Sequence, residues 1–236
     1  MPLILGLETS ADICAGALVA DGEVLGVSRL EMSRGHAEAL VPMVQDIAAI
    51  AGVELAALDL IGVTRGPGSF TGVRTGLAAA RGFAIAADAP AIGVSSLQAV
   101  ACNAVRALTG TGPVLCVLDT RRADYFAQTF DQAGAEISAP GVMNAEDLFE
   151  LITSTQPVLA GNAVSRLLSG YDGDLDSLRR APGTGTADPV DVAAIAETIF
   201  SQSGPNKKGL AQDTLSPLYL RAPEAKLPVN GGRLKR

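Results

Sequence analysis

The chain has 236 residues, of which 48% are hydrophobic and 18% charged, so it can build a packed core and is not a disordered protein. Its formal net charge is −7, and all four lysines lie after residue 206, so an acidic body precedes a basic terminus. We do not expect the acidic body to bind a nucleic-acid backbone by itself, and the 4% aromatic content supplies few rings for base stacking. The basic terminus either binds a phosphate backbone or, as is more common for short basic tails, is a solvated terminus.

Several kinds of chemistry are excluded by missing residue types. His36 is the one histidine, which excludes a multi-histidine metal site, and the body has no lysine for a Walker-type loop or a Schiff base. The three cysteines form no CxxC pair and are expected to be reduced core thiols. Glu8 interrupts the first apolar run, and no apolar run reaches the roughly 18 residues that a membrane helix needs. We therefore expect no signal peptide, no membrane contact and a cytoplasmic protein.

The first half predicts a three-stranded meander followed by alternating helices and strands. Asp21-Gly22 is a strong two-residue hairpin signal between the second and third strands. Apolar residues at three- and four-residue spacing then indicate a helix, and a strand, a glycine-rich loop and a long helix follow. The predicted strands are 3–8, 13–20, 23–31, 59–64 and 91–94, and the predicted helices are 35–51, 71–87 and 95–107.

The second half repeats this pattern. Leu7-Glu8-Thr9 matches Leu118-Asp119-Thr120 at an offset of 111, and each triplet ends the first strand of a meander. The predicted strands are 113–118, 123–130, 136–142 and 157–160, the predicted helices are 144–153 and about 188–200, and 170–189 is a predicted loop. Chance similarity of two meanders is the alternative to a duplication. We expect a duplicated βββαβα motif that forms two lobes, residues 1–107 and 108–210, with the break between them near residues 104–112. Residues 211–236 are expected to pack back on the fold and then to end in a basic tail.

The two acidic turns are candidates for phosphate chemistry. Backbone amides and hydroxyls of a turn such as Glu8-Thr9-Ser10 can hold phosphate oxygens, and the carboxylate can orient a magnesium ion. Asp119 occupies the matching place in the second copy. An ordinary polar turn between core strands is the alternative interpretation.

The sequence GPGSFTGVR at residues 66–74 follows a strand and opens a helix. Amides at a helix N-terminus form a natural anion site, but this loop matches neither a Walker loop nor GxGxxG. The alternative is a tight glycine turn with Ser69 or Thr71 as the N-cap.

A line of small residues marks the helix after that loop. It either packs tightly within the lobe or lets a partner helix approach closely. We expect it to face a like-folded partner, with apolar positions of the preceding helix completing the patch. His36 is expected to be structural or interfacial rather than catalytic. The predicted partner interface is His36, Leu40, Val44, Ile47, Gly72, Gly76, Ala80 and Phe83.

Five segments together resemble one protein family along nearly the whole chain. They are LGLETS at 5–10, RGHAEALVP at 34–42, GPGSFTGVR at 66–74, LDTRRADYF at 118–126 and PLYLR at 217–221. This set resembles the TsaB (YeaZ) family. The resemblance implies an α/β, actin-like (ribonuclease H-like) two-lobed fold and a role in making threonylcarbamoyladenosine beside the anticodon of tRNA.

In that family TsaB is a non-catalytic subunit that pairs with the transferase TsaD, and the ATPase TsaE joins the pair. TsaD holds metal with two histidines, and Ser96 and Val100 stand at the matching places here. The resemblance thus implies no catalytic residue, no metal and no required cofactor, with weak nucleotide binding at Glu8, Thr9, Ser10 and Asp119 left open. It also implies a homodimer when the chain is alone, and it leaves direct tRNA contact open. The alternatives are an active phosphotransferase that uses Glu8 and Asp119 and, less favoured, a metallopeptidase.

Overall fold

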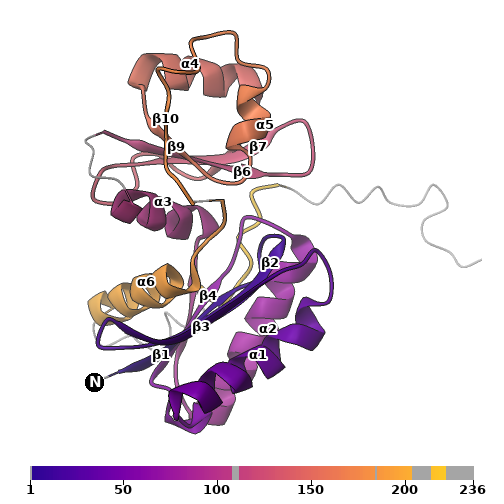
Figure 1. Ribbon diagram of the computed structural model, residues 1–236, viewed down its shortest axis with the longest axis vertical. Coiled ribbons are helices and arrows are strands. Elements are labelled where there is room, and N and C mark those ends of the chain that lie inside the picture. Colours follow the sequence, from indigo (N-terminus) through magenta and orange to yellow (C-terminus); the bar gives the residue numbers. More distant parts are fainter. Residues whose placement is uncertain (1, 108–111, 184, 204–213, 222–236) are drawn as a thin grey trace, which may run out of the picture.

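Two five-stranded sheets lie one above the other with helices on both faces of each (Figure 1). The computed structural model describes residues 2–107, 112–183, 185–203 and 214–221. The strand order is β3-β2-β1-β4-β5 in the first sheet and β8-β7-β6-β9-β10 in the second. In each sheet the meander is antiparallel and the last two strands run parallel to the first.

The first sheet and its helices come from the first half of the chain. Buried aliphatic residues fill both faces of β1 and β4, as expected for strands covered on two sides. The elements are β1 (Leu3–Glu8), β2 (Ile13–Ala20), β3 (Glu23–Glu31), α1 (His36–Ala51), η1 (Leu55–Ala57), β4 (Leu60–Thr64), α2 (Phe70–Ala87), β5 (Ala91–Val94) and α3 (Ser96–Ala107).

The second half has the same order of elements, so the predicted duplication and fold class are confirmed at the level of topology. The elements are β6 (Val114–Asp119), β7 (Tyr125–Phe130), β8 (Gly141–Met143), α4 (Ala145–Thr155), β9 (Val158–Ala160), α5 (Val164–Leu168), β10 (Arg179–Arg180) and α6 (Pro189–Gln202). The β8 strand is shorter and begins later than the predicted 136–142. Both α5 and β10 were missed, since each is too short to carry a periodic pattern.

The last helix of each half packs on the sheet of the other half. Helix α3 lies against β6, β7 and β9, whereas α6 lies against β1, β2, β4 and β5. Figure 1 shows both helices between the two sheets. One buried cluster therefore joins residues from both halves, including Ile4, Val100, Val114 and Val192. The two lobes share a core, and the division at residue 107 stays a prediction because residues 108–111 lie outside the described part of the chain.

Helices α1 and α2 cover the outer face of the first sheet, and their packing corrects the predicted partner interface. All eight predicted interface residues are buried within the single chain. A Cβ atom added to Gly72 would lie 2.0 Å from the Thr9 carbonyl oxygen, and one added to Gly76 would lie 2.4 Å from the Thr9 hydroxyl. The small residues of α2 thus admit the end of β1, not a partner helix, and the prediction for this stripe is wrong.

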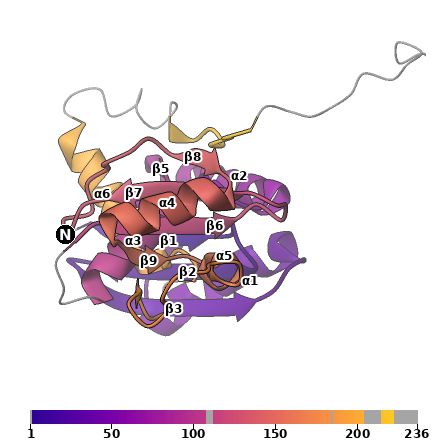
Figure 2. The same cartoon turned by 90° about the horizontal axis from the view of Figure 1, so that it is seen from above.

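The described part of the C-terminal segment, residues 214–221, crosses from one lobe to the other. The Leu218 amide donates to the Arg65 carbonyl at 2.7 Å, and Arg221 forms an ion pair with Asp124 of the second lobe. Figure 1 shows this yellow segment between the lobes, and Figure 2 shows it at one edge of the molecule. Within the described residues, no helix is both long and apolar enough to cross a membrane.

Candidate functional site

A cleft between the lobes brings the two acidic turns together. Its lining comes from the β1–β2 turn, the GPGS loop, α3, the β6–β7 turn and the loop before α6. Residues that the sequence singled out in separate segments meet here: Ser10, Ser96, Val100 and Asp119. The free volume is about 40 Å³, far below the roughly 300–1,000 Å³ of ordinary small-molecule sites. In this conformation the cleft has no room for a nucleotide.

Glu8 and Thr9 lie beneath the cleft surface rather than on it. Glu8 is fully buried, and its Oε1 accepts hydrogen bonds from the Ser10 amide at 2.5 Å, the Ser10 hydroxyl at 2.8 Å and the Ala11 amide at 3.1 Å. The Thr9 hydroxyl donates to the Gly72 carbonyl at 2.8 Å. These bonds fasten the turn to itself and to α2, so the acidic turn is used to hold the lobe together.

Burial sets the protonation behaviour of Glu8. Loss of water raises its pKa from 4.5 to about 7, and the hydrogen bonds from Ser10, Thr64 and Ala11 only partly oppose this. Glu8 Oε2 and the Thr64 hydroxyl are both buried, and neither makes a hydrogen bond of good geometry. The neutral form of Glu8 is therefore favoured up to a higher pH than in an exposed glutamate.

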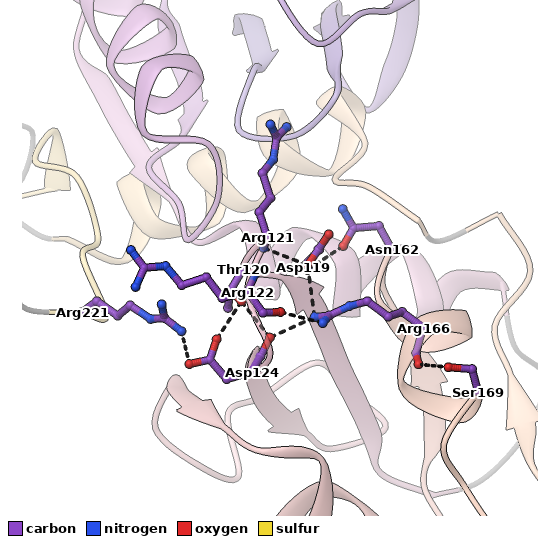
Figure 3. A network of polar contacts seen from close by, with 9 residues as sticks. All are labelled: Asp119, Thr120, Arg121, Arg122, Asp124, Asn162, Arg166, Ser169 and Arg221. Carbon is purple, nitrogen blue, oxygen red and sulfur yellow. Dashed lines mark hydrogen bonds and ion pairs between the residues drawn. The ribbon is translucent and has the colours of Figure 1, made fainter. Parts of the chain in front are cut away.

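Asp119 is held by a network of the second lobe (Figure 3). Its Oδ1 accepts from the Arg121 amide at 2.8 Å and lies 3.1 Å from the Arg166 guanidinium. Arg166 also donates to the Asp124 carbonyl at 2.9 Å, and the Asn162 amide oxygen accepts from the Asp119 amide at 2.9 Å. A cation is therefore already paired with the carboxylate that was a candidate to orient a magnesium ion.

Direct contacts between the halves close the cleft. The Ser10 and Ser96 hydroxyls share a hydrogen bond of 2.8 Å, and Arg121 lies 2.5 Å from Asp12 across the opening. Arg106 of α3 binds Asp191 of α6 at 2.5 and 3.1 Å. Ser96 stands where TsaD has a metal-binding histidine, and here its hydroxyl instead forms a hydrogen bond with the Ser10 hydroxyl of the β1–β2 turn.

The GPGS loop and His36 have structural partners. The Ser69 side chain accepts from the Gly72 amide at 3.3 Å, so Ser69 is the N-cap of α2. The Ser69 amide donates to the Ser10 carbonyl at 2.7 Å, which fixes the loop on the acidic turn. His36 Nε2 lies 3.1 Å from the Ile13 carbonyl, so this nitrogen carries the proton and ties α1 to β2.

A second concave surface lies on the outside of the first lobe, between α1 and α2. Its free volume is about 500 Å³. Val41 and Phe70 are exposed by 41% and 59%, which is unusual for apolar side chains beside each other. The groove residues are Ala37, Leu40, Val41, Phe70, Thr71, Arg74, Thr75, Ala78 and Ala79. Of the predicted interface only Leu40 borders this groove. Sequence analysis missed the others, although apolar residues on the polar side of an amphipathic helix were a usable signal.

The fold and the duplicated acidic turns define a protein of the actin-like class, and comparisons with known proteins agree. A solved inorganic polyphosphate/ATP-glucomannokinase from Arthrobacter covers 84% of this chain and 100% of its own, with a TM-score of 0.51 at 13% identity, which shows the fold alone. The family model for tRNA N6-adenosine threonylcarbamoyltransferase (TsaD) matches residues 22–172, more than half of the chain.

Closer relatives place the chain within this group. The Escherichia coli protein called tRNA threonylcarbamoyladenosine biosynthesis protein TsaB is 40% identical over 123 residues, or 52% of each chain. A crystal structure from Pseudomonas aeruginosa, described as similar to peptidase YeaZ, is 27% identical with a TM-score of 0.78, covering 94% of this chain and 100% of the other. The chain belongs to the TsaB/YeaZ family, as the sequence resemblance predicted. Its match to the curated TsaB relative spans about half of that protein's length.

Proposed function

We propose that the chain is a non-catalytic subunit in the biosynthesis of threonylcarbamoyladenosine on tRNA. In this proposal it pairs with a TsaD-type transferase, and a TsaE-type ATPase joins the pair. The name of the E. coli relative supplies the pathway. The observation that carries the non-catalytic role is the inter-lobe cleft, whose acidic groups are committed to internal bonds and whose free volume is about 40 Å³.

The outer groove between α1 and α2 supports pairing. Apart from Arg74, its exposed residues are small or apolar, so a second pair of helices can approach both α1 and α2 closely. A four-helix contact on this surface leaves the buried stripe of α2 inside the lobe. The same groove would serve a homodimer when the transferase is absent, because a two-fold contact uses one patch twice.

Transfer of the threonylcarbamoyl group to tRNA tests the proposal. The chain, the TsaD-type protein and the TsaE-type protein of the same organism are assayed separately and in combination, with tRNA, an activated threonylcarbamoyl donor, ATP and metal supplied. We expect transfer by the combination, none by this chain alone, and a large loss when this chain is left out. Transfer by the isolated chain would contradict the non-catalytic role.

The phosphotransferase alternative makes a different prediction. It requires ATP turnover by the isolated chain, and this turnover must fall when Asp119 is replaced by Asn. Such a result would favour the alternative, whereas turnover at the level of a no-protein blank supports the proposal. Asp131→Asn, at a turn of the same lobe outside the cleft, is the matched control.

A further inference from the structure

A second groove, on the side of the molecule where the C-terminal segment crosses between the lobes, has an unusual chemistry. Its free volume is about 350 Å³. It is lined by the start of α2, the β6–β7 turn and residues 218–221, which are Pro67, Gly68, Phe70, Arg74, Arg122, Phe126, Leu218, Tyr219, Leu220 and Arg221. Of these described residues three are arginines and none is acidic, although the chain as a whole carries a net charge of −7.

Aromatic rings form one wall of this arginine groove. Phe70 and Tyr219 are stacked, with their centroids 5.9 Å apart and an interplanar angle of 22°. Arg74 lies against both rings, with its guanidinium carbon 3.4 Å from the Phe70 ring centre and 5.6 Å from the Tyr219 ring centre. Both rings are about half exposed. Three of the nine aromatic residues of the chain line this one groove, so the low aromatic content is concentrated where stacking is available.

The other wall presents positive charge. Arg221 is anchored by its ion pair with Asp124. Figure 3 shows Arg122 and Arg221 on the same side of the network, away from Arg166, and both line the groove. Cations gathered around one concavity raise the local positive potential and attract a polyanion.

We propose that the arginine groove binds single-stranded RNA, with a base on the Phe70–Tyr219 stack and phosphates at Arg122 and Arg221. Stacked rings beside arginines are what single-stranded nucleic acids require. An acidic peptide would use the arginines but has no need of the stacked rings. The chain's own terminus is a poor occupant, because residues 222–236 hold four cations and one acidic side chain.

This inference rests on the proposed function, in which the complex acts on a tRNA loop. It adds that this subunit itself contacts the RNA. Phe70 and Arg74 line both this groove and the outer α1–α2 groove, whereas Arg122, Tyr219 and Arg221 line the arginine groove but not the outer one. Variants at the latter three positions therefore separate RNA binding from pairing.

Fluorescence anisotropy with a labelled tRNA transcript, using the full chain at low salt, tests the inference. We expect Tyr219→Ala to weaken binding about 5- to 150-fold, the range for loss of one base stack. Arg122→Ala should reduce the slope of log K against log salt by about 0.7. The matched controls are Tyr171→Ala, which alters the aromatic pair with Phe149 elsewhere on the chain, and Arg34→Ala, an exposed arginine outside the groove. Both controls should bind like the unchanged chain.

Three outcomes would overturn the inference: absence of RNA binding by the unchanged chain, unchanged binding by both groove variants, or equal binding of poly-glutamate. Light scattering of the same samples with the TsaD-type protein reports pairing independently. Intact pairing without RNA binding removes this inference and leaves the proposed function standing. RNA binding through the groove without pairing removes the proposed function and leaves the RNA site.

Discussion

Gly76 offers a sharp test of how α2 packs. A Cβ atom at this position would lie 2.4 Å from the Thr9 hydroxyl and 3.2 Å from a methyl group of Val63. To relieve the first contact Thr9 must turn away and lose its bond to the Gly72 carbonyl, leaving a buried polar group unpaired at a cost of about 1–3 kcal/mol. Alanine gains about 1 kcal/mol over glycine inside a helix. The difference is a fall of up to about 2 kcal/mol in the free energy of unfolding of Gly76→Ala, and the close contact with Val63 adds to this fall.

Gly82 is the matched control, because it lies on the same helix and a Cβ there would meet nothing within 4 Å. Gly82→Ala should raise the free energy of unfolding by up to about 1 kcal/mol. Urea denaturation followed by circular dichroism measures both variants, with an unchanged slope m as the check that only stability has changed. The reasoning is refuted if Gly76→Ala is as stable as the unchanged chain, or if both variants shift stability in the same direction.

Three further predictions concern buried and capping groups. The pKa of Glu8 is raised in the folded state, so Glu8 contributes most to stability at low pH, and this contribution falls by about 3 kcal/mol as pH rises from 4.5 to 8. Glu8→Gln should remove most of this fall, as measured by urea denaturation across the same pH range. An equally steep fall in the variant would contradict the prediction. His36→Phe should cost about 1–2 kcal/mol by leaving the Ile13 carbonyl unpaired, with the melting temperature as the measure and an unchanged value as the refutation. Asn144→Ala should cost about 1 kcal/mol and Asn144→Gly only a few tenths, because the side chain caps α4; equal losses would argue against the cap.

Most of the fold follows from the sequence because its signals are local. Alternating and continuous apolar runs predicted the meander strands, and the offset of 111 between Glu8 and Asp119 predicted the duplication that the two sheets display. The packing of α3 and α6 on the sheet of the opposite half could not be predicted, because the sequence of an amphipathic helix does not determine which sheet its apolar face covers.

The candidate site was predicted less well, for two physical reasons. The stripe from Gly72 to Ala80 shows that something approaches α2 closely, but the sequence cannot tell whether this is a partner helix or, as here, the end of β1. The burial of Glu8 depends on Thr64 and the loop around residue 69, which are distant in sequence. The arginine groove joins residues 70, 122 and 219, a combination that exists only once the C-terminal segment has folded back.

The central claim is that this chain pairs with a TsaD-type protein through the outer face of α1 and α2. Light scattering of the purified mixture measures it most directly, with Ala78→Arg as the test variant and Ile50→Arg as the control. Ala78 is exposed in the groove, whereas Ile50 is exposed on α1 outside it. We predict a heterodimer with the unchanged chain and with Ile50→Arg, and separate components with a normally folded Ala78→Arg. A folded Ala78→Arg that still forms the heterodimer, or an unchanged chain that forms none, would contradict the account.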